Sequence, residues 1–127
     1  MGRGGIPESN RTKCRLDLPE DDIAIDRDHA TALFRILQET LTNVARHANA
    51  TQVNVRLAKE EGTLILEVHD NGKGINKEQL SAGRSLGILG MRERALLLGG
   101  GLAISGAPGE GTTIKVRIPE PYHKKTE

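Results

Sequence analysis

The fold of this chain is decided by one stretch, Thr51-Gln-Val-Asn-Val-Arg-Leu-Ala-Lys-Glu-Glu-Gly-Thr-Leu-Ile-Leu-Glu-Val-His-Asp70. Apolar residues alternate with polar ones on both sides of Glu61-Gly62: Val53, Val55 and Leu57 before it, and Leu64, Leu66 and Val68 after it. A period of two is typical of a strand with one buried face, and two such runs around a two-residue turn form a hairpin. The stretch therefore predicts an antiparallel β-hairpin.

The residues before this hairpin follow a helical period instead. From Asp28 onward, apolar side chains recur every three or four positions, at Leu33, Leu37, Leu41, Val44 and Ala48. This spacing is typical of an amphipathic helix, with Asp28 as the expected N-cap and an end near Asn49.

The rest of the chain supplies the other elements of a layered fold. We expect an edge strand at 14–18, one helical turn at 76–81, a helix at 88–98, and a strand pair at 102–105 and 113–118. Strands and helices intermixed in this order predict the α/β class. The expected architecture is a two-layer α/β sandwich, with a mixed, mostly antiparallel sheet covered by helices on one face.

Length and composition limit the organisation and the function. The 127 residues suit one compact domain, which we place at 13–120, after a flexible lead-in or cloning remnant at 1–12 and before a charged tail at 121–127. Eighteen basic and 17 acidic residues leave a net charge of +1, so no bulk field attracts polyanions or anionic lipid. With only 2% aromatic residues, stacking platforms for single-stranded nucleic acid are missing.

Cysteine usage and hydropathy indicate the compartment. Cys14 is the only cysteine, which excludes an intramolecular disulfide and a multi-cysteine zinc site within these 127 residues. The longest uncharged stretch, 95–109, is interrupted by glycines and is shorter than the roughly 18 apolar residues that span a bilayer. We therefore expect a cytoplasmic domain without direct membrane contact.

The polar side of the first helix is the first candidate site. Glu39, Asn43, Arg46 and His47 gather within an arc of roughly 100°, opposite the apolar residues, with Ile36 as the one apolar residue among them. Together they offer a carboxylate, a neutral oxygen suited to Mg²⁺ and donors for phosphate oxygens. An ordinary solvated helix face with i,i+4 pairs remains the alternative.

Asp70 is the second candidate, because it shares a strand face with Leu64, Leu66 and Val68. A carboxylate at the end of an apolar face needs donors, which the amine of a planar ligand would supply. Backbone amides of an Asx turn at Asp70-Asn71-Gly72 would serve equally well, and the residues alone leave both readings open.

Glycines form the third candidate. Gly72 and Gly74 follow the strand, and Gly87 and Gly90 lie at the start of the second helix, where backbone amides and the helix dipole favour anions. Ordinary turns remain the alternative. The chain contains neither the G-x-x-x-x-G-K-[ST] phosphate loop nor the G-x-G-x-x-G fingerprint, so both common nucleotide folds are disfavoured.

Taken together, these motifs resemble the ATP-binding domain of sensor histidine kinases, in the superfamily shared with DNA gyrase and MutL. The resemblance covers about 14–119 and rests on four motifs in the expected order: Glu39-Thr-Leu-Thr-Asn43-Val-Ala-Arg46-His47-Ala48, Asp70-Asn-Gly72-Lys-Gly74-Ile75, Ser85-Leu-Gly87-Ile-Leu-Gly90-Met-Arg-Glu-Arg94 and Gly109-Glu-Gly111-Thr112-Thr113-Ile114. The first and third motifs are most similar to the nitrate-sensor and lipid-desaturase-sensor branch of bacterial two-component kinases.

The resemblance implies a Bergerat ATP-binding fold and a role for each matching residue. Asn43 would coordinate Mg²⁺, Arg46 and His47 would face the phosphates or the ribose, and Asp70 would accept from the adenine amine. Thr113, alone or with Thr112, would support that contact directly or through water.

Further roles follow from the same resemblance. Gly72 and Gly74 would let the chain pass close to the base, Ile75 would be a further ATP-binding residue, and Glu39 would be the catalytic candidate. The segment 76–90 would be a lid that is ordered by phosphate contacts through Gly87, Ile88, Leu89, Gly90 and Met91.

The implied activity is transfer of the γ-phosphoryl of Mg-ATP to a histidine on a dimerisation domain, with a response regulator downstream. His29 is not expected to be that acceptor, because Ala30 follows it instead of an acid; a surface position is expected. Without the dimerisation hairpin, these residues should bind ATP and not autophosphorylate. Membrane attachment of the parent kinase stays open.

Two alternatives remain. An anti-sigma-factor kinase of the same superfamily phosphorylates serine on a partner and needs no histidine hairpin. A non-enzymatic binding module would keep the fold and lose the nucleotide.

Overall fold

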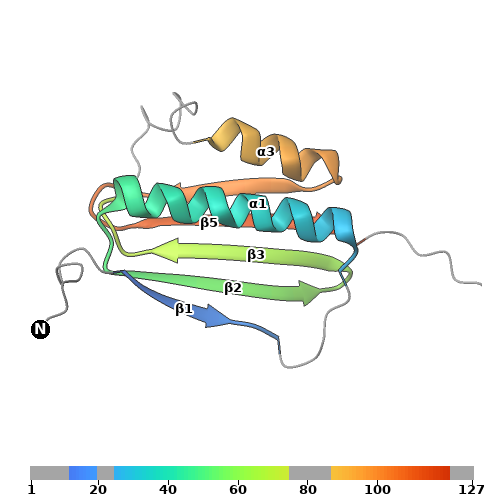
Figure 1. The fold of residues 1–127 in the computed structure, drawn as a ribbon, viewed down its shortest axis with the longest axis horizontal. Helices are drawn as coiled ribbons and strands as arrows, with labels where there is room; N and C mark the ends of the chain where they lie inside the picture. Colours follow the sequence, from blue (N-terminus) through green and yellow to red (C-terminus); the bar gives the residue numbers. More distant parts are fainter. Residues whose placement is uncertain (1–11, 20–24, 75–86, 121–127) are drawn as a thin grey trace, which may run out of the picture.

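The computed structural model describes residues 12–19, 25–74 and 87–120, which form two layers (Figure 1). In chain order the elements are β1 (Lys13–Asp17), α1 (Arg27–Asn43), η2 (Val44–Ala48), β2 (Gln52–Glu60), β3 (Thr63–Asp70), α3 (Ile88–Leu97), β4 (Gly101–Gly106) and β5 (Thr112–Pro119). The expected two-layer α/β sandwich is confirmed. The helical turn expected at 76–81 and most of the expected lid lie outside the described residues.

The sheet is mixed and mostly antiparallel, as expected. Its strand order is β1-β2-β3-β5-β4, and only the β1–β2 pair is parallel. The β2–β3 hairpin is confirmed, with Glu61 and Gly62 at φ 52° and 78° in its two-residue turn. Two consecutive positive φ values are typical of a type I′ turn, whose twist matches that of the flanking strands.

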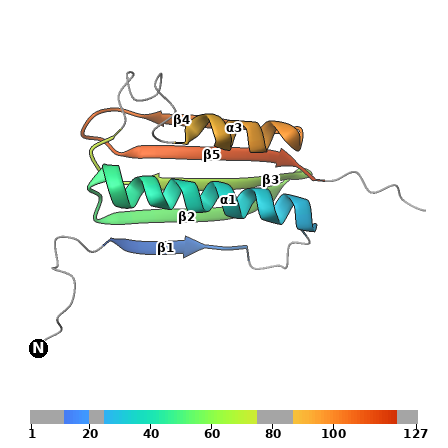
Figure 2. The same ribbon diagram turned by 45° about the horizontal axis from the view of Figure 1, so that its top comes forward.

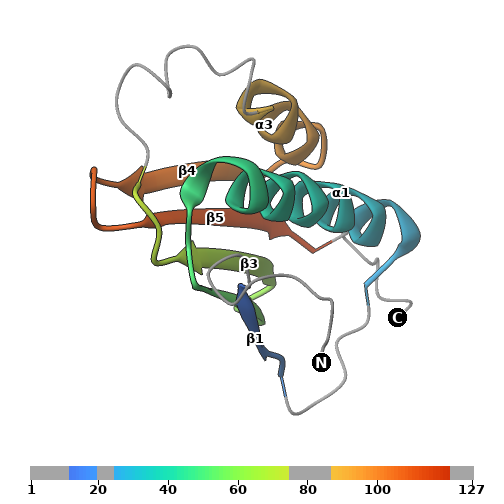
Figure 3. The same cartoon turned by 60° about the vertical axis from the view of Figure 1, so that its left-hand side comes forward.

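Both helices cover the same face of the sheet (Figures 2 and 3). The period of two brings the alternate apolar residues of β3 and β5 to this face, where Leu64, Val116 and Ile118 are fully buried. Arg92 of α3 fastens the helix layer to the sheet, since its Nη1 donates to the Leu102 carbonyl at 2.8 Å. No helix among the described residues is long and apolar enough to cross a membrane.

The start of α1 differs from the expectation. Asp26, not Asp28, is the N-cap, and its Oδ1 accepts from the His29 N–H at 3.0 Å. The expectation that His29 is a surface residue is wrong, because its ring is buried with Nε2 3.0 Å from the Pro119 carbonyl. Nδ1 lies 2.7 Å from Asp26 Oδ1 without hydrogen-bond geometry. His29 therefore joins the start of α1 to the end of β5.

The buried side of α1 is also rotated from the expected apolar arc. Ile36, expected among polar residues, is 0% exposed, whereas Leu37 and Leu41 are only partly buried. The cause is α3, which packs beside α1: the Thr40 hydroxyl donates to the Ile36 carbonyl at 2.8 Å and contacts Met91 Sδ at 3.5 Å. The helix thus buries one flank against the sheet and another against α3.

After Asn43 the helix widens into one π-helical turn, η2, and ends at Asn49 in the left-handed conformation with φ 56°. A π turn adds a residue per hydrogen-bonded ring and changes the direction of the side chains after it, which is why such turns often occur at functional sites. The expected end of the helix near Asn49 is confirmed.

The end of β3 is joined tightly to the end of η2. The Lys73 N–H donates to the Ala48 carbonyl at 2.8 Å. A methyl group at Gly72 would overlap that same carbonyl, so only glycine allows the two backbones to approach this closely. Asn71 strengthens the junction, since its Oδ1 accepts from the N–H groups of Thr51 and Gln52, each at 3.0 Å.

We predict that Ile36→Ala lowers the free energy of unfolding by about 2–5 kcal/mol, because it opens a cavity between α1 and α3. Phe34→Ala is the matched control on the same helix: Phe34 is 57% exposed, and its loss should change stability by less than about 0.5 kcal/mol. Urea denaturation followed by circular dichroism measures both, and equal losses would contradict the rotated burial of α1.

We also predict that Gly72→Ala destabilises the chain by about 1–3 kcal/mol, because the added methyl group forces η2 and β3 apart. Gly101→Ala is the control, since nothing lies within 4 Å of its added methyl group and its change should stay under about 0.5 kcal/mol. Chemical denaturation gives the comparison. A Gly72 variant as stable as the Gly101 variant would show that the junction tolerates separation.

Candidate functional site

Asp70 is a buried carboxylate at the last position of β3. Its side chain lies on the helix-covered face with Leu64, Leu66 and Val68, as expected, and is 5% exposed. Oδ1 accepts from the Gly72 N–H at 2.8 Å, so Asp70 makes the Asx turn that the sequence offered as one of two possibilities. An ionised carboxylate offers about four lone-pair sites, so the turn leaves acceptor capacity for a ligand donor.

The two threonines differ in how they relate to Asp70. Thr112 is its direct partner on β5, and residues directly opposite in an antiparallel pair point to the same face. Thr113 pairs with His69, and its Oγ1 lies 2.8 Å from His69 Nδ1 on the other face of the sheet. Thr113 therefore makes no direct contact with Asp70, so of its two expected modes only support through water stays a prediction, and Thr112 is the residue on the Asp70 face.

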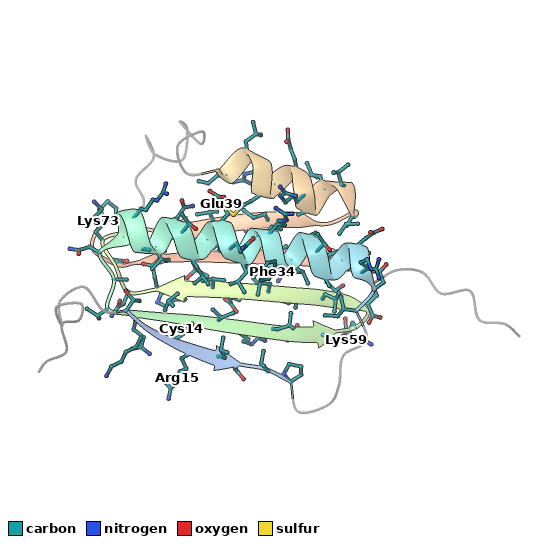
Figure 4. All side chains as sticks on the ribbon, viewed as in Figure 1. Cys14, Arg15, Phe34, Glu39, Lys59 and Lys73 are labelled. Carbon is teal, nitrogen blue, oxygen red and sulfur yellow. The ribbon has the colours of Figure 1, made fainter. Side chains whose placement is uncertain are left out.

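The expected polar side of α1 lies at the boundary with α3 and not opposite the core. Glu39 and Asn43, one helical turn apart, are both half-buried, whereas Arg46 is exposed on η2. Figure 4 shows Glu39 on the side of α1 that faces α3. The side chain of His47 lies outside the described part of the chain.

The N-terminus of α3 meets this boundary. Gly87, with φ 67°, precedes the helix and makes no side-chain cap. A methyl group at Gly87 would overlap the Glu39 carboxylate, so these two residues are in close contact. The first N–H groups of a helix have no partner within it and carry the positive end of the helix dipole, which suits an anion such as phosphate.

A pocket of about 410 Å³ lies between the two helices at this point. Besides Glu39 and the start of α3, it is lined by four polar or charged residues that were not expected at the site: Arg35, Gln38, Thr42 and Arg94. The sequence contained an indication of this pocket wall, because Arg35, Gln38 and Thr42 recur at helical spacing beside Glu39. What the sequence lacked was the position of α3, which supplies the other wall.

The remaining residues expected at the site are Gly74, Ile75, Ile88, Leu89, Gly90 and Met91. The side chains of Ile88 and Met91 are buried in the core, so only their backbone can face a nucleotide, whereas Leu89 and Gly90 are exposed. A methyl group at Gly74 would overlap the Ala107 carbonyl of the β4–β5 turn. Ile75 lies outside the described residues.

The two halves of the expected site lie at the same end of the molecule. Figure 1 shows the end of α1, the end of β3, the β4–β5 turn and the start of α3 together, and Figure 4 places Lys73 there. The hydrogen bond from Lys73 to Ala48 connects β3 to η2 directly, and Gly87 touches Glu39. A buried acceptor and an amide-rich helix start, beside a pocket lined by two arginines, therefore lie at the same end of the molecule.

Comparison with known proteins identifies relatives of this chain. The chain is 41% identical over 111 residues to the sensor histidine kinase LiaS of Bacillus subtilis and 41% identical over 98 residues to the sensor protein VraS of Staphylococcus epidermidis. These matches cover 86% and 77% of this chain but only 31% and 28% of the relatives. The chain thus spans about a third of the length of the curated relatives it matches.

The fold agrees with these matches. The ATP-binding domain of PrrB from Mycobacterium tuberculosis superposes with a TM-score of 0.69 at 22% identity, over 92% of this chain and 84% of that one. Residues 28–122 match the family described as histidine kinase-, DNA gyrase B-, and HSP90-like ATPase. Since this match covers most of the chain, the chain belongs to the family of histidine kinase-, DNA gyrase B- and HSP90-like ATPases.

Proposed function

We propose that the chain is the Mg-ATP-binding catalytic domain of a sensor histidine kinase. The observation that carries the proposal is the buried Asp70 carboxylate, which keeps acceptor capacity at the same end of the molecule as the N-terminus of α3. The first element suits an adenine amine and the second suits phosphate oxygens. Membership of the ATPase family and the names of the relatives agree with this assignment.

Adenine recognition is assigned to Asp70, with Thr112 beside it. A buried carboxylate forms a strong, charge-assisted hydrogen bond with an N–H donor, and it repels a base that presents an oxygen instead. Methyl groups at Gly72 and Gly74 would overlap the Ala48 and Ala107 carbonyls, so these glycines let the chain after Asp70 pass close to neighbouring backbone. The site should therefore prefer adenine over hypoxanthine or guanine, whose corresponding position is a carbonyl.

The triphosphate end is assigned to Asn43, Arg46 and the amides of 87–91. The carboxamide oxygen of Asn43 is the neutral, hard ligand that Mg²⁺ accepts in proteins, and the ion would neutralise phosphate charge when bound. Arg46 is exposed on η2, within reach of solvent anions. Glu39 stays a proposed catalytic group; its carboxylate lies beside Gly87, where the phosphates would be held.

For the whole protein we propose transfer of the γ-phosphoryl to a histidine of its own dimerisation domain, followed by transfer to a response regulator. In such a reaction this chain positions the nucleotide and stabilises its charge and contributes little covalent chemistry. The nitrate-sensor and desaturase-sensor branch is proposed on the similarity of the first and third motifs alone.

We predict that Asp70→Asn weakens ATP binding by about 10–100-fold, the size of one charged hydrogen bond. The variant should fold normally, because the asparagine oxygen can still accept from Gly72. Inosine triphosphate should gain affinity relative to ATP, since the new amide donates to its carbonyl. Titration calorimetry with both nucleotides measures the change. Glu67→Gln, the same chemical change on the opposite face of β3, is the control, and an unchanged Asp70→Asn dissociation constant would refute the assignment.

We further predict that Asn43→Ala weakens ATP binding in the presence of Mg²⁺ by about tenfold, which is most of the affinity that the ion adds. Binding of AMP should stay unchanged. AMP is the internal control, because it tests the adenine contact without a bridged triphosphate. Titrations with and without Mg²⁺ separate the contribution of the metal ion to the affinity from that of the adenine contact. Asn54→Ala, on the uncovered face of β2, should behave as wild type; equal losses of AMP and Mg-ATP binding in Asn43→Ala would contradict a role in metal binding.

A further inference from the structure

The outer edge of β1 is a second surface that can bind a partner. In the described part of the chain β1 pairs with β2 on one side only, and all five of its residues are exposed. Both helices lie away from β1 in Figures 1 and 2, and Figure 4 marks Cys14 and Arg15 on this outermost strand. A strand edge without a neighbour presents N–H and C=O groups that can pair with another strand.

The backbone direction of each β1 residue follows from its pairing with β2. The Lys13 N–H donates to the Thr51 carbonyl at 2.9 Å, so the backbone of Lys13 faces β2. Because alternate residues of a strand face the same neighbour, Arg15 and Asp17 also bond toward β2. The N–H and C=O groups of Cys14 and Leu16 then point outward, where they can bond to an added strand.

The side chains of β1 divide in the same way. Lys13, Arg15 and Asp17 point to the uncovered face of the sheet, and Cys14 and Leu16 point to the helix side. Leu16 and Leu18 are 62% and 58% exposed, so they form an apolar strip that no described residue covers. A partner strand must therefore bring charges of both signs on one face and apolar side chains on the other.

A second copy of β1 meets both requirements. We propose that two copies of this chain associate through their β1 edges as an antiparallel pair, with Leu16 opposite Leu16 on the two-fold axis. In this register Cys14 lies opposite Leu18 of the other copy, and each Arg15 lies opposite an Asp17 in a non-hydrogen-bonded pair, where side chains approach most closely.

Charge selects this register among the symmetric ones. Shifting the axis to Arg15 places two guanidinium groups directly opposite each other, which is destabilising. The axis at Leu16 instead forms two Arg15–Asp17 pairs and continues the apolar strip across both copies. Pro19 does not interfere with this pairing. Like Lys13, Arg15 and Asp17, it is at a position whose N–H would point toward β2, so the outward edge loses no donor.

The association is weak by itself. One pair of five-residue strands buries less than the roughly 800 Å² per partner of a standard stable interface. Two chains held together by another contact would pair much more readily, because their effective concentration rises to the millimolar range. The proposal does not depend on nucleotide binding, so its failure would leave the proposed function untouched.

Disulfide trapping of the full 127-residue chain tests the register. In a Cys14→Ser background, Leu16→Cys should form a covalent dimer under mild oxidation about tenfold faster than Arg15→Cys. In the proposed register the residue 16 Cα atoms lie about 5.5 Å apart, within disulfide reach, and the residue 15 Cα atoms are diagonal at about 7–8 Å. The wild-type chain, which has only Cys14, should form a covalent dimer no faster than the Arg15→Cys variant does.

A charge exchange supplies the second readout. In the Leu16→Cys, Cys14→Ser background, Asp17→Arg should slow trapping about tenfold, because two arginine pairs replace two ion pairs. Adding Arg15→Asp restores the opposite charges and should restore the rate. These exposed positions leave folding intact. Equal trapping at positions 15 and 16, or no rescue by the charge exchange, would overturn the proposal and leave the edge to a different occupant.

Discussion

The structure depends on one close approach, where the backbone at the end of β3 meets the backbone at the end of η2. The hydrogen bond from Lys73 to Ala48 and the missing side chain of Gly72 hold these two segments together. Asp70 begins the same turn and accepts from Gly72, so its carboxylate is oriented by the turn that makes the junction. The β4–β5 turn closes the other side against Gly74. The position of the Asp70 carboxylate at this end of the sheet is therefore set by backbone packing.

A second constraint comes from α1, which has two neighbours. The sheet and α3 both pack on it, so its buried stripe runs through Ile36 and Thr40 and leaves Glu39 and Asn43 at the rim between the helices. Side chains at such a rim are ordered by packing and yet reach solvent. Such a position suits contact with a polar ligand, because packing holds the side chain in place while its polar end stays accessible.

The sequence predicted those parts of the fold that depend on local periodicity. The β2–β3 hairpin, the second helix, the β4–β5 pair and the inward position of Asp70 follow from periods of 2 and 3.6 and from turn residues. The errors arose where a neighbour decides the outcome. The burial of Ile36 depends on α3, that of His29 on the end of β5, and the choice of Thr112 over Thr113 on the register between β3 and β5. The ligand-binding roles of all the site residues, His47 and Ile75 included, stay predictions.

The most direct measurement is paramagnetic broadening of backbone amide signals by Mn²⁺ bound with ADP. A single cleft predicts the strongest broadening at Asn43 and 87–91, near the phosphates. When diamagnetic Mg²⁺ replaces Mn²⁺, chemical shift changes are expected at Asp70 and Gly72, where the base would lie. Amides at the opposite end of the sheet, such as those of Glu60 and Thr63 beside the β2–β3 turn, should keep their intensity. Broadening centred on that end, or an Asp70 signal that does not respond to nucleotide, would contradict a single cleft shared by the β3 terminus and the rim of α1.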